Sequence, residues 1–282
     1  MDGFLFINKA KGMTSHDVVY RVKRKLKIDK IGHTGTLDPF ASGLLILCIG
    51  KATKLQSLFL NLDKTYEGVI VLGKHYDTLD VTGTIIEEKE VNLSEKEILK
   101  AVQSFNKRYE QLPPMYSALK VNGQKLYELA RKGIEVEREK RDVTIYDFKM
   151  TSPYLNQSFS FFASVSKGTY IRSLASDLAE ELKTLGALSE LNRLTIGNYV
   201  LSQAKSIEEI EISDIITLDT FFKDQPSIVL SEYLIKLVKN GVYLDERQLN
   251  TQHPFIVKNQ EGHMIAYYEV IGENIYKPIL IF

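Results

Sequence analysis

The chain has 282 residues, enough for about two domains or for one large domain with a small addition. With 44% hydrophobic and 26% charged residues it has a globular composition, which excludes a disordered, collagen-like or repeat protein. The 36 basic and 36 acidic side chains cancel, but residues 1–60 carry ten basic and four acidic ones, 107–141 nine and five, and 206–224 one and six. This uneven distribution predicts a basic face on a neutral protein.

The sequence gives no sign of a secreted or membrane protein. Its longest unbroken apolar run, Leu44–Ile49, has six residues, whereas a membrane-spanning helix needs roughly 20. No basic segment followed by an apolar one opens the chain, so no secretory signal is visible. The single cysteine, Cys48, lies in an apolar run and cannot form an internal disulfide. We therefore expect Cys48 to be a buried strand residue and the protein to be cytoplasmic.

Strand and helix patterns alternate through the first half of the chain. Val18, Val22 and Leu26 recur every four residues after Thr14 and Ser15, either of which can cap a helix. Apolar runs predict strands over 4–7, 44–49 and 66–72, and the capping box in 94–97 opens a second helix. Residues 107–141 are polar, basic and interrupted by proline and glycine, which predicts a long excursion with a short helix around 125–131.

The second half predicts a strand over 159–165 and then a helix whose leucines continue to Leu185 and which ends at Gly186. The acidic stretch 206–224 is expected to be a spacer between two domains, 1–222 and 226–282. In the smaller region, Ser231 can cap a helix that is expected to end at Gly241, and strands are expected over 255–257, 264–268 and 276–281.

One irregular segment, Gly32–Pro39 with the sequence GHTGTLDP, is the best candidate for a site. Its two glycines permit a tight turn, and Pro39 keeps Asp38 out of the helical region. A carboxylate is therefore expected on a loop just before a buried strand, where catalytic groups are often found. The residues alone also fit a simple Asp-Pro turn with an accompanying histidine.

Five motifs resemble, in the same order, those of the TruB family of bacterial tRNA pseudouridine synthases, which act on uridine 55. They are Gly3–Lys9 with Thr14–Asp17, Gly32–Leu45, Lys64–Tyr66, Pro113–Lys120 with Gly123 and Gln124, and Lys167–Leu174 with Leu191–Leu194. The resemblance covers about 200 residues and is weak over the last 57. It implies an α+β fold, the pseudouridine synthase fold, with a mixed, largely antiparallel sheet and helices around a central cleft.

The resemblance also implies how the chain is divided. A catalytic domain would occupy 1–222, and its insertion 107–141 would close over RNA. Residues 226–282 would form a small PUA-like RNA-binding domain. The implied partner is the T-arm of tRNA, bound by a monomer.

By the same resemblance, the enzyme flips uridine 55 out of the T-loop and converts it to pseudouridine without metal or cofactor. Asp38 matches the essential aspartate, and three routes stay open for it: attack on C1′ of the ribose, attack on C6 of the base, or removal of a sugar proton to give a glycal. Arg172 matches its arginine partner. The remaining matches are to the tyrosine that stacks on the base (Tyr66), to residues that line the uracil pocket (Tyr170 and Leu191) and to the histidine that wedges into the T-loop (His33).

Two other hypotheses about function compete with that of a pseudouridine synthase. The segment His75–Asp80 holds three potential metal ligands within six residues, which suggests a metal-dependent hydrolase. Alternatively, the chain is a non-catalytic RNA-binding protein on the same scaffold. Such a protein needs only phosphate contacts, so the presence of Asp38, Tyr66 and Arg172 favours catalysis.

Overall fold

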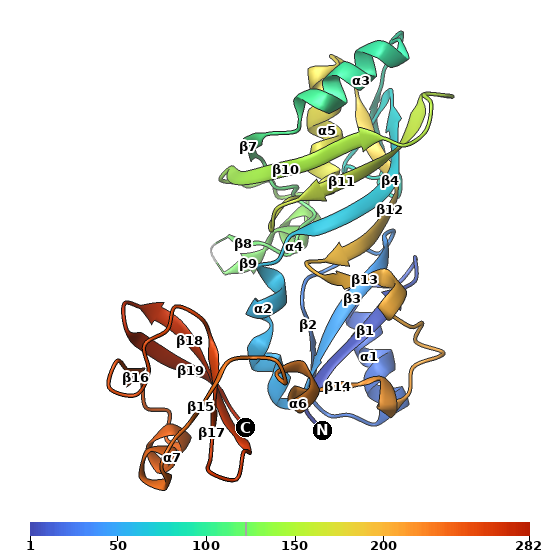
Figure 1. Cartoon of the computed structure of the whole chain (residues 1–282). Helices are drawn as coiled ribbons and strands as arrows, with labels where there is room; N and C mark the ends of the chain where they lie inside the picture. Colours follow the sequence, from blue (N-terminus) through green and yellow to red (C-terminus); the bar gives the residue numbers. More distant parts are fainter. Residues whose placement is uncertain (122) are drawn as a thin grey trace.

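The structure, a computed structural model, describes residues 1–121 and 123–282; residue 122, inside the predicted excursion 107–141, lies outside them. A ten-stranded sheet runs through the main body in the order β14-β1-β3-β12-β4-β11-β10-β7, with β13 beside β12 and β2 beside β3 (Figure 1). Its strands are β1 Gly3–Lys9, β2 Ile31–His33, β3 Ser42–Ile49, β4 Lys64–Leu72, β7 Arg108–Gln111, β10 Arg141–Met150, β11 Ser158–Val165, β12 Gly186–Ile196, β13 Tyr199–Val200 and β14 Ile216–Thr217. The pairing is antiparallel except where β3 meets β12.

Helices cover this sheet in two groups. At one end α3 and α5 share a buried cluster with β4, β10, β11 and β12, and at the other α1 packs on β1 and β3 (Figure 1). The helices are α1 Ser15–Leu26, α2 Ser57–Leu60, α3 Glu95–Ser104, α4 Leu126–Ala130, α5 Ile171–Glu181, α6 Leu218–Phe221 and α7 Glu232–Lys239, with short 3-10 helices at Gly50–Leu55, Leu201–Gln203 and Ile212–Asp214. Two small hairpins, β5 Lys74–Tyr76 with β6 Ile85–Glu88 and β8 Lys120–Val121 with β9 Gln124–Lys125, complete this part.

Most predicted elements are confirmed, since their signals are local. Helix α1 begins after the N-cap Thr14, whose side chain accepts a hydrogen bond from Asp17 N, and Val18, Val22 and Leu26 are buried. Helix α3 begins at the predicted capping box, with Ser94 as its N-cap. Strands β1, β3, β4 and β11 cover the predicted apolar runs, and Cys48 is fully buried in β3.

One predicted boundary is wrong, and the strands β7 and β12 were not predicted from the sequence. Residues 108–111 of the expected excursion form β7, an edge strand paired with β10, which the sequence did not reveal. Helix α5 ends at Glu181 rather than at Gly186, because the chain turns through Lys183, whose φ is 56°. Gly186 instead begins β12, a central strand whose two bulges disturb the alternation that would have indicated it.

The C-terminal region forms its own five-stranded sheet, in the order β15-β17-β18-β19-β16, and this curled sheet is consistent with a PUA-like region. Its strands are β15 Ser227–Val229, β16 Leu244–Asp245, β17 Phe255–Lys258, β18 Met264–Gly272 and β19 Ile275–Ile281. Ile256, Tyr267 and Leu280 of this sheet belong to the same buried cluster as Phe4 and Phe59 of the main body. The two sheets therefore share a core.

The acidic stretch 206–224 is not the spacer that its charge suggests. Ile207, Ile210 and Ile215 are buried in one cluster with Val18 and Val22 of α1. Strand β14 within this stretch pairs with β1. Most of its acidic side chains are exposed while Ile207, Ile210 and Ile215 complete the core, so 206–222 is part of the main body.

Candidate active site

Asp38 lies on the loop between β2 and β3, and the loop is fixed at both ends. Leu37, next to Asp38, donates its N–H to Ser15 Oγ at 2.9 Å, and Pro39 O accepts a hydrogen bond from Gly12 N at 2.7 Å. Ser15 is the first residue of α1, so the start of that helix holds the loop. Gly35, with φ of 114°, makes the turn into the loop, as its residue type predicted.

Arg172 approaches Asp38 from the start of α5. Its Nε lies 2.8 Å from Asp38 Oδ2 and its Nη2 donates to Asp38 Oδ1 at 3.1 Å, so two parallel hydrogen bonds join the planar groups. The two residues are 134 positions apart in the sequence. The structure thus brings together the two residues that the resemblance paired.

Arg172 also makes two hydrogen bonds to backbone carbonyls. Its Nη1 donates to Thr78 O at 2.7 Å and its Nη2 to Tyr116 O at 2.6 Å, while Asp80 Oδ2 lies 3.9 Å from Nη1. The Arg172 side chain is 4% exposed and that of Asp80 5%. From the sequence, Asp80 is expected only as a potential metal ligand or as a turn residue in Asp80-Val-Thr-Gly, and its place beside Arg172 is not predicted.

Burial raises the pKa of Asp38, and the Arg172 guanidinium opposes this by favouring the carboxylate. Asp80 adds to the rise, and Lys9 counteracts it. Lys9 is itself fully buried in β1 and donates to Met13 O at 2.8 Å. Burial lowers the pKa of Lys9 to about 8, against the effect of Asp38. Asp38 therefore lies among two buried cations and one buried carboxylate.

The cavity at Asp38 has a volume of about 530 Å³. The start of α1, the Asp38 loop, the β5–β6 connection, the insertion and α5 all contribute to its wall, through His16, Asp38, Thr78, Asp80, Tyr116, Ser117, Lys125, Tyr127, Arg131 and Arg172 among others. On the insertion, Tyr127 has Lys125 and Arg131 near its ring, with Lys125 Nζ and Arg131 Cζ at 5.4 and 5.5 Å from the centroid. A flat, cationic wall of this kind suits a base and its phosphate.

The other predicted site residues are not among the described residues that line this cavity, and Leu191 lines a separate pocket with Ser42, Glu67 and Asn192. Tyr66 on β4 and Leu191 on β12 are 8% and 5% exposed and belong to the same buried cluster as Leu37. Tyr170 is the N-cap of α5, and burial raises the pKa of its hydroxyl. His33 ends β2, and its ring meets that of His16 edge to face at 5.2 Å. Burial, followed by His16, lowers the pKa of His33.

The residues of the suggested metal site have other partners. Asp77 Oδ2 accepts a hydrogen bond from Tyr116 OH at 3.2 Å, and Asp80 Oδ1 accepts one from Thr82 N at 3.0 Å. His75 lies in the β5–β6 hairpin. Over 1–121 and 123–282, no group of three or more His, Cys, Asp or Glu side chains could hold a metal ion.

Among the helices of the same described residues, none has both the length and the apolar composition that a membrane span requires.

Comparison with known proteins agrees with this geometry. A family model described as TruB family pseudouridylate synthase (N terminal domain) matches residues 23–171. Proteins named tRNA pseudouridine synthase B are similar over nearly the whole chain: one from Onion yellows phytoplasma (strain OY-M) is 52% identical and covers 100% of both chains, and one from Acholeplasma laidlawii (strain PG-8A) is 50% identical and covers 95% of both.

The fold is shared with solved structures as well. A chain in the crystal structure of a Cbf5-Nop10-Gar1 complex superposes with a TM-score of 0.69 at 21% identity, over 96% of this chain and 79% of that one. At this identity the likeness concerns the fold, which is the pseudouridine synthase fold with its large, mostly antiparallel sheet. Together, the family match and the relatives that span the chain show that it belongs to the TruB family of pseudouridylate synthases, which are isomerases.

Proposed function

We propose that this protein isomerises uridine to pseudouridine at position 55 in the T-loop of tRNA, with Asp38 as the essential catalytic residue. The proposal rests on the Asp38–Arg172 ion pair, in which Arg172 is buried and Asp38 is 32% exposed, on the wall of a cavity large enough for a nucleotide. Relatives that span the chain are named as tRNA pseudouridine synthases, which supports tRNA as the substrate. In the same proposal the enzyme works as a monomer in the cytoplasm, with neither metal nor organic cofactor.

The reaction exchanges one glycosidic bond for another. The bond between C1′ and N1 breaks, the uracil rotates, C1′ bonds to C5, C5 loses its proton and N1 gains one, so the atoms balance without a co-reactant. Attack of Asp38 on C1′ or on C6 and removal of a sugar proton by Asp38 all require the ionised carboxylate. Arg172 favours the ionised form of Asp38 and fixes the orientation of its carboxylate plane. The pair would therefore contribute to catalysis as well as to the fold.

The remaining predicted residues would serve binding. A uridine inside an RNA loop must leave its stack before a protein can act on it, and its unstacking costs a few kcal/mol. Tyr66 would stack on the flipped uracil, with Leu191 and Tyr170 on the sides of the pocket, and His33 would take the place of the base in the RNA. Their positions around the Asp38 loop support these roles. The insertion, with Lys125, Tyr127 and Arg131 on the cavity wall, would close over the T-arm.

Tritium release from C5-labelled uridine in a T-arm hairpin tests the proposal. With no metal or cofactor added, wild-type protein should release tritium, and Asp38→Asn should lose at least about a thousandfold in rate, or roughly 4 kcal/mol of barrier. Filter binding should show that Asp38→Asn still holds the RNA. Asp29→Asn makes the same change at an exposed carboxylate and should keep the wild-type rate. More than a tenth of the wild-type rate in Asp38→Asn would contradict the assignment, and binding without release by the wild type would favour a non-catalytic RNA-binding protein.

A further inference from the structure

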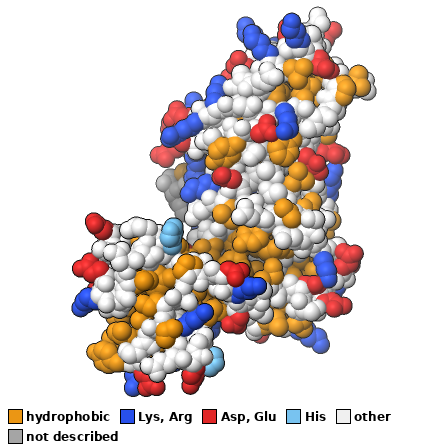
Figure 2. Space-filling view, in the orientation of Figure 1, with side chains coloured by type: hydrophobic (Ala, Val, Ile, Leu, Met, Phe, Trp, Pro, Cys, Tyr) orange, Lys and Arg blue, Asp and Glu red, His pale blue; other side chains and the backbone are white. Residues whose placement is uncertain are grey.

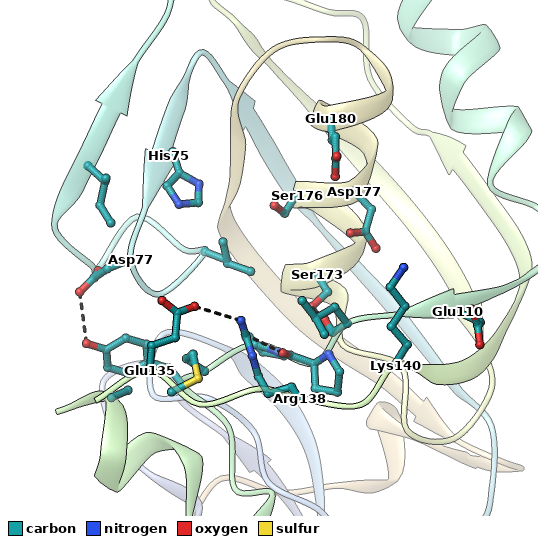
Figure 3. A pocket seen from close by; sticks show the side chains of 18 of the residues that line it. His75, Asp77, Glu110, Glu135, Arg138, Lys140, Ser173, Ser176, Asp177 and Glu180 are labelled. Carbon is teal, nitrogen blue, oxygen red and sulfur yellow. Dashed lines mark hydrogen bonds and ion pairs between the residues drawn. The ribbon is translucent and has the colours of Figure 1, made fainter. Parts of the chain in front are cut away.

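A second, larger cavity lies on the other side of the insertion, next to α5. Its volume is about 770 Å³, and Ser173, Ser176, Asp177 and Glu180 project into it from one helix (Figure 3). Arg172, on the same helix, lines the Asp38 cavity instead, and Tyr116 of the insertion lines both cavities. Of these four side chains in the described residues, only Asp177 is hydrogen-bonded to another side chain, that of Tyr109. The further hydrogen bonds of Tyr109 lead toward the start of α5.

Three hydrogen bonds form a continuous chain from Asp177 to the backbone of Tyr170. Tyr109 OH donates to Asp177 Oδ2 at 2.9 Å, Gln111 Nε2 donates to Tyr109 OH at 2.7 Å, and Tyr170 N donates to Gln111 Oε1 at 2.8 Å. Gln111 is 1% exposed, so neither end of its amide can exchange its partner for water.

The direction of each bond follows from the chemistry of the groups. A backbone N–H can only donate, so Tyr170 N fixes the oxygen of the Gln111 amide on its side. The amide nitrogen must then donate to Tyr109, and the Tyr109 proton is left for Asp177. Burial raises the pKa of Asp177 to about 6, against the hydrogen bond from Tyr109, so the carboxylate is an acceptor at neutral pH. Asp177 and Tyr109 therefore hold the Gln111 amide with its oxygen directed at Tyr170 N.

This oxygen acts at the start of the helix that carries Arg172. Tyr170 is the N-cap of α5, and its own side chain makes no capping hydrogen bond. Gln111 on β7 and the bond from Ser173 Oγ to Leu112 O at 2.8 Å are thus the ties between this helix end and the base of the insertion. Arg172 is two residues after Tyr170, so a shift of the helix end would move its guanidinium away from Asp38. Displacements of about 1 Å in such groups can cost a hundredfold in rate.

We infer that Gln111, oriented by Tyr109 and Asp177, is a positioning residue that sets the place of Arg172 opposite Asp38. The inference rests on the proposed function, since it assigns Gln111 a role in that reaction. Gln111→Met keeps the length of the side chain but removes both hydrogen bonds. Its single-turnover rate of tritium release should fall at least tenfold, while its affinity for the T-arm hairpin stays within about twofold of the wild type.

Gln111→Glu gives a second readout that a purely structural role would not produce. A protonated glutamate offers one acceptor and one donor, as the amide does, whereas the carboxylate offers acceptors only. Asp177 lies near position 111 and is itself influenced by Glu180 and Lys140, and Arg141 lies opposite Gln111 in the β7–β10 ladder. Because burial and Asp177 favour the protonated form, the rate of Gln111→Glu relative to wild type should recover as the pH falls from 8 to 6.

Asn106→Leu is the matched control. Asn106 is also a side-chain amide bonded to backbone in both directions, donating to Phe148 O and accepting from Phe148 N, but it lies away from the start of α5. Loss of the Asn106 amide should lower the melting temperature of the protein but leave the rate of tritium release by the folded protein unchanged. Wild-type protein that releases no tritium would overturn the proposed function. If the wild type is active, three results would overturn the role of Gln111 alone. They are a Gln111→Met rate within twofold of the wild-type rate, a Gln111→Met rate no slower than that of Asn106→Leu, and a Gln111→Glu rate that does not recover at low pH.

Discussion

At the scale of single residues, Arg172 determines the geometry of the site. It bonds to both oxygens of Asp38 and to two backbone carbonyls from the β5–β6 connection and the insertion. Breaking a buried pair of this kind leaves one charge uncompensated, which is more costly than losing a surface ion pair. One side chain therefore links the Asp38 loop to two segments that the sequence places far from it.

Arg172→Lys should slow isomerisation at least about tenfold, because an ammonium cannot make the two parallel bonds to Asp38. The pH dependence should change as well. Arg172 lowers the pKa of Asp38 against the rise caused by burial, and a less aligned charge would lower it less. The rate requires ionised Asp38 and falls as the pH drops through its pKa, so in the variant this fall should occur at higher pH. Single-turnover rates between pH 5 and 8 measure this, and an unchanged acidic limb would contradict it.

Among the secondary-structure elements, a short parallel contact fixes the strand that follows the Asp38 loop. Ser42 and Gly43 at the start of β3 pair with Asn192 and Arg193 of β12. Gly43 has φ of 109°, and a Cβ there would lie 2.4 Å from Arg193 O and 2.5 Å from Arg193 N. Glycine is thus required both by conformation and by close approach, because the obstacle is backbone of a central strand.

Gly43→Ala should lower the free energy of unfolding by about 3 kcal/mol or more, since the strain of a positive φ adds to the clash with β12. Gly168→Ala is its counterpart. Gly168 also has a positive φ, 80°, but an added Cβ would meet nothing within 4 Å, so the cost should be about 1–2 kcal/mol. Urea denaturation followed by circular dichroism compares the two variants. Equal losses would show that β12 yields at this contact.

At the scale of the whole molecule, the C-terminal sheet completes the core of the main body. Tyr267 on β18 stacks on Phe222 with ring centroids 4.7 Å apart, and Phe222 packs in the same cluster as Phe4 and Phe59. The division at 222 and 226 stays a prediction. A chain that ends at Phe222 would expose this cluster to water, so we do not expect it to keep the stability of the full chain.

Tyr267→Ala should lower the free energy of unfolding by about 3 kcal/mol, as expected for removal of a buried aromatic side chain. Because the cluster includes Leu44 and Ile46, amide protons of β3 should lose protection against hydrogen exchange together with those of β18. Tyr243→Ala removes the same side chain at an exposed position and should have little effect. Loss of protection confined to 226–282 would show that the two sheets unfold independently.

The charge distribution also belongs to this scale. Figure 2 shows basic and acidic side chains interspersed over the face in view. Part of the positive charge of 1–60 is used internally, since Lys25 Nζ donates to the carbonyl oxygens of Ile207 and Glu208. We predict that RNA binding depends on the remaining basic residues near the Asp38 cavity. Lys125→Ala should reduce the slope of log K against log salt by roughly 0.7 to 0.9, whereas Lys25→Ala should leave it unchanged.

The amino-acid sequence predicts correctly the elements whose signals are local. The capping boxes at Thr14 and Ser94 and the apolar runs of β1 and β3 needed no distant partner, and the motif around Asp38 indicated the loop and the family. Only the tertiary structure decided which residues surround Asp38. In the sequence, Asp80 resembles an ordinary turn residue and Gln111 an ordinary loop residue, and only the packing of α5 beside them shows their contacts. Strand β12 was not predicted because its bulges interrupt the alternation of apolar and polar residues. Local patterns record backbone preference and amphipathicity, whereas the charge state and contacts of a buried side chain depend on groups that only folding brings within a few ångströms.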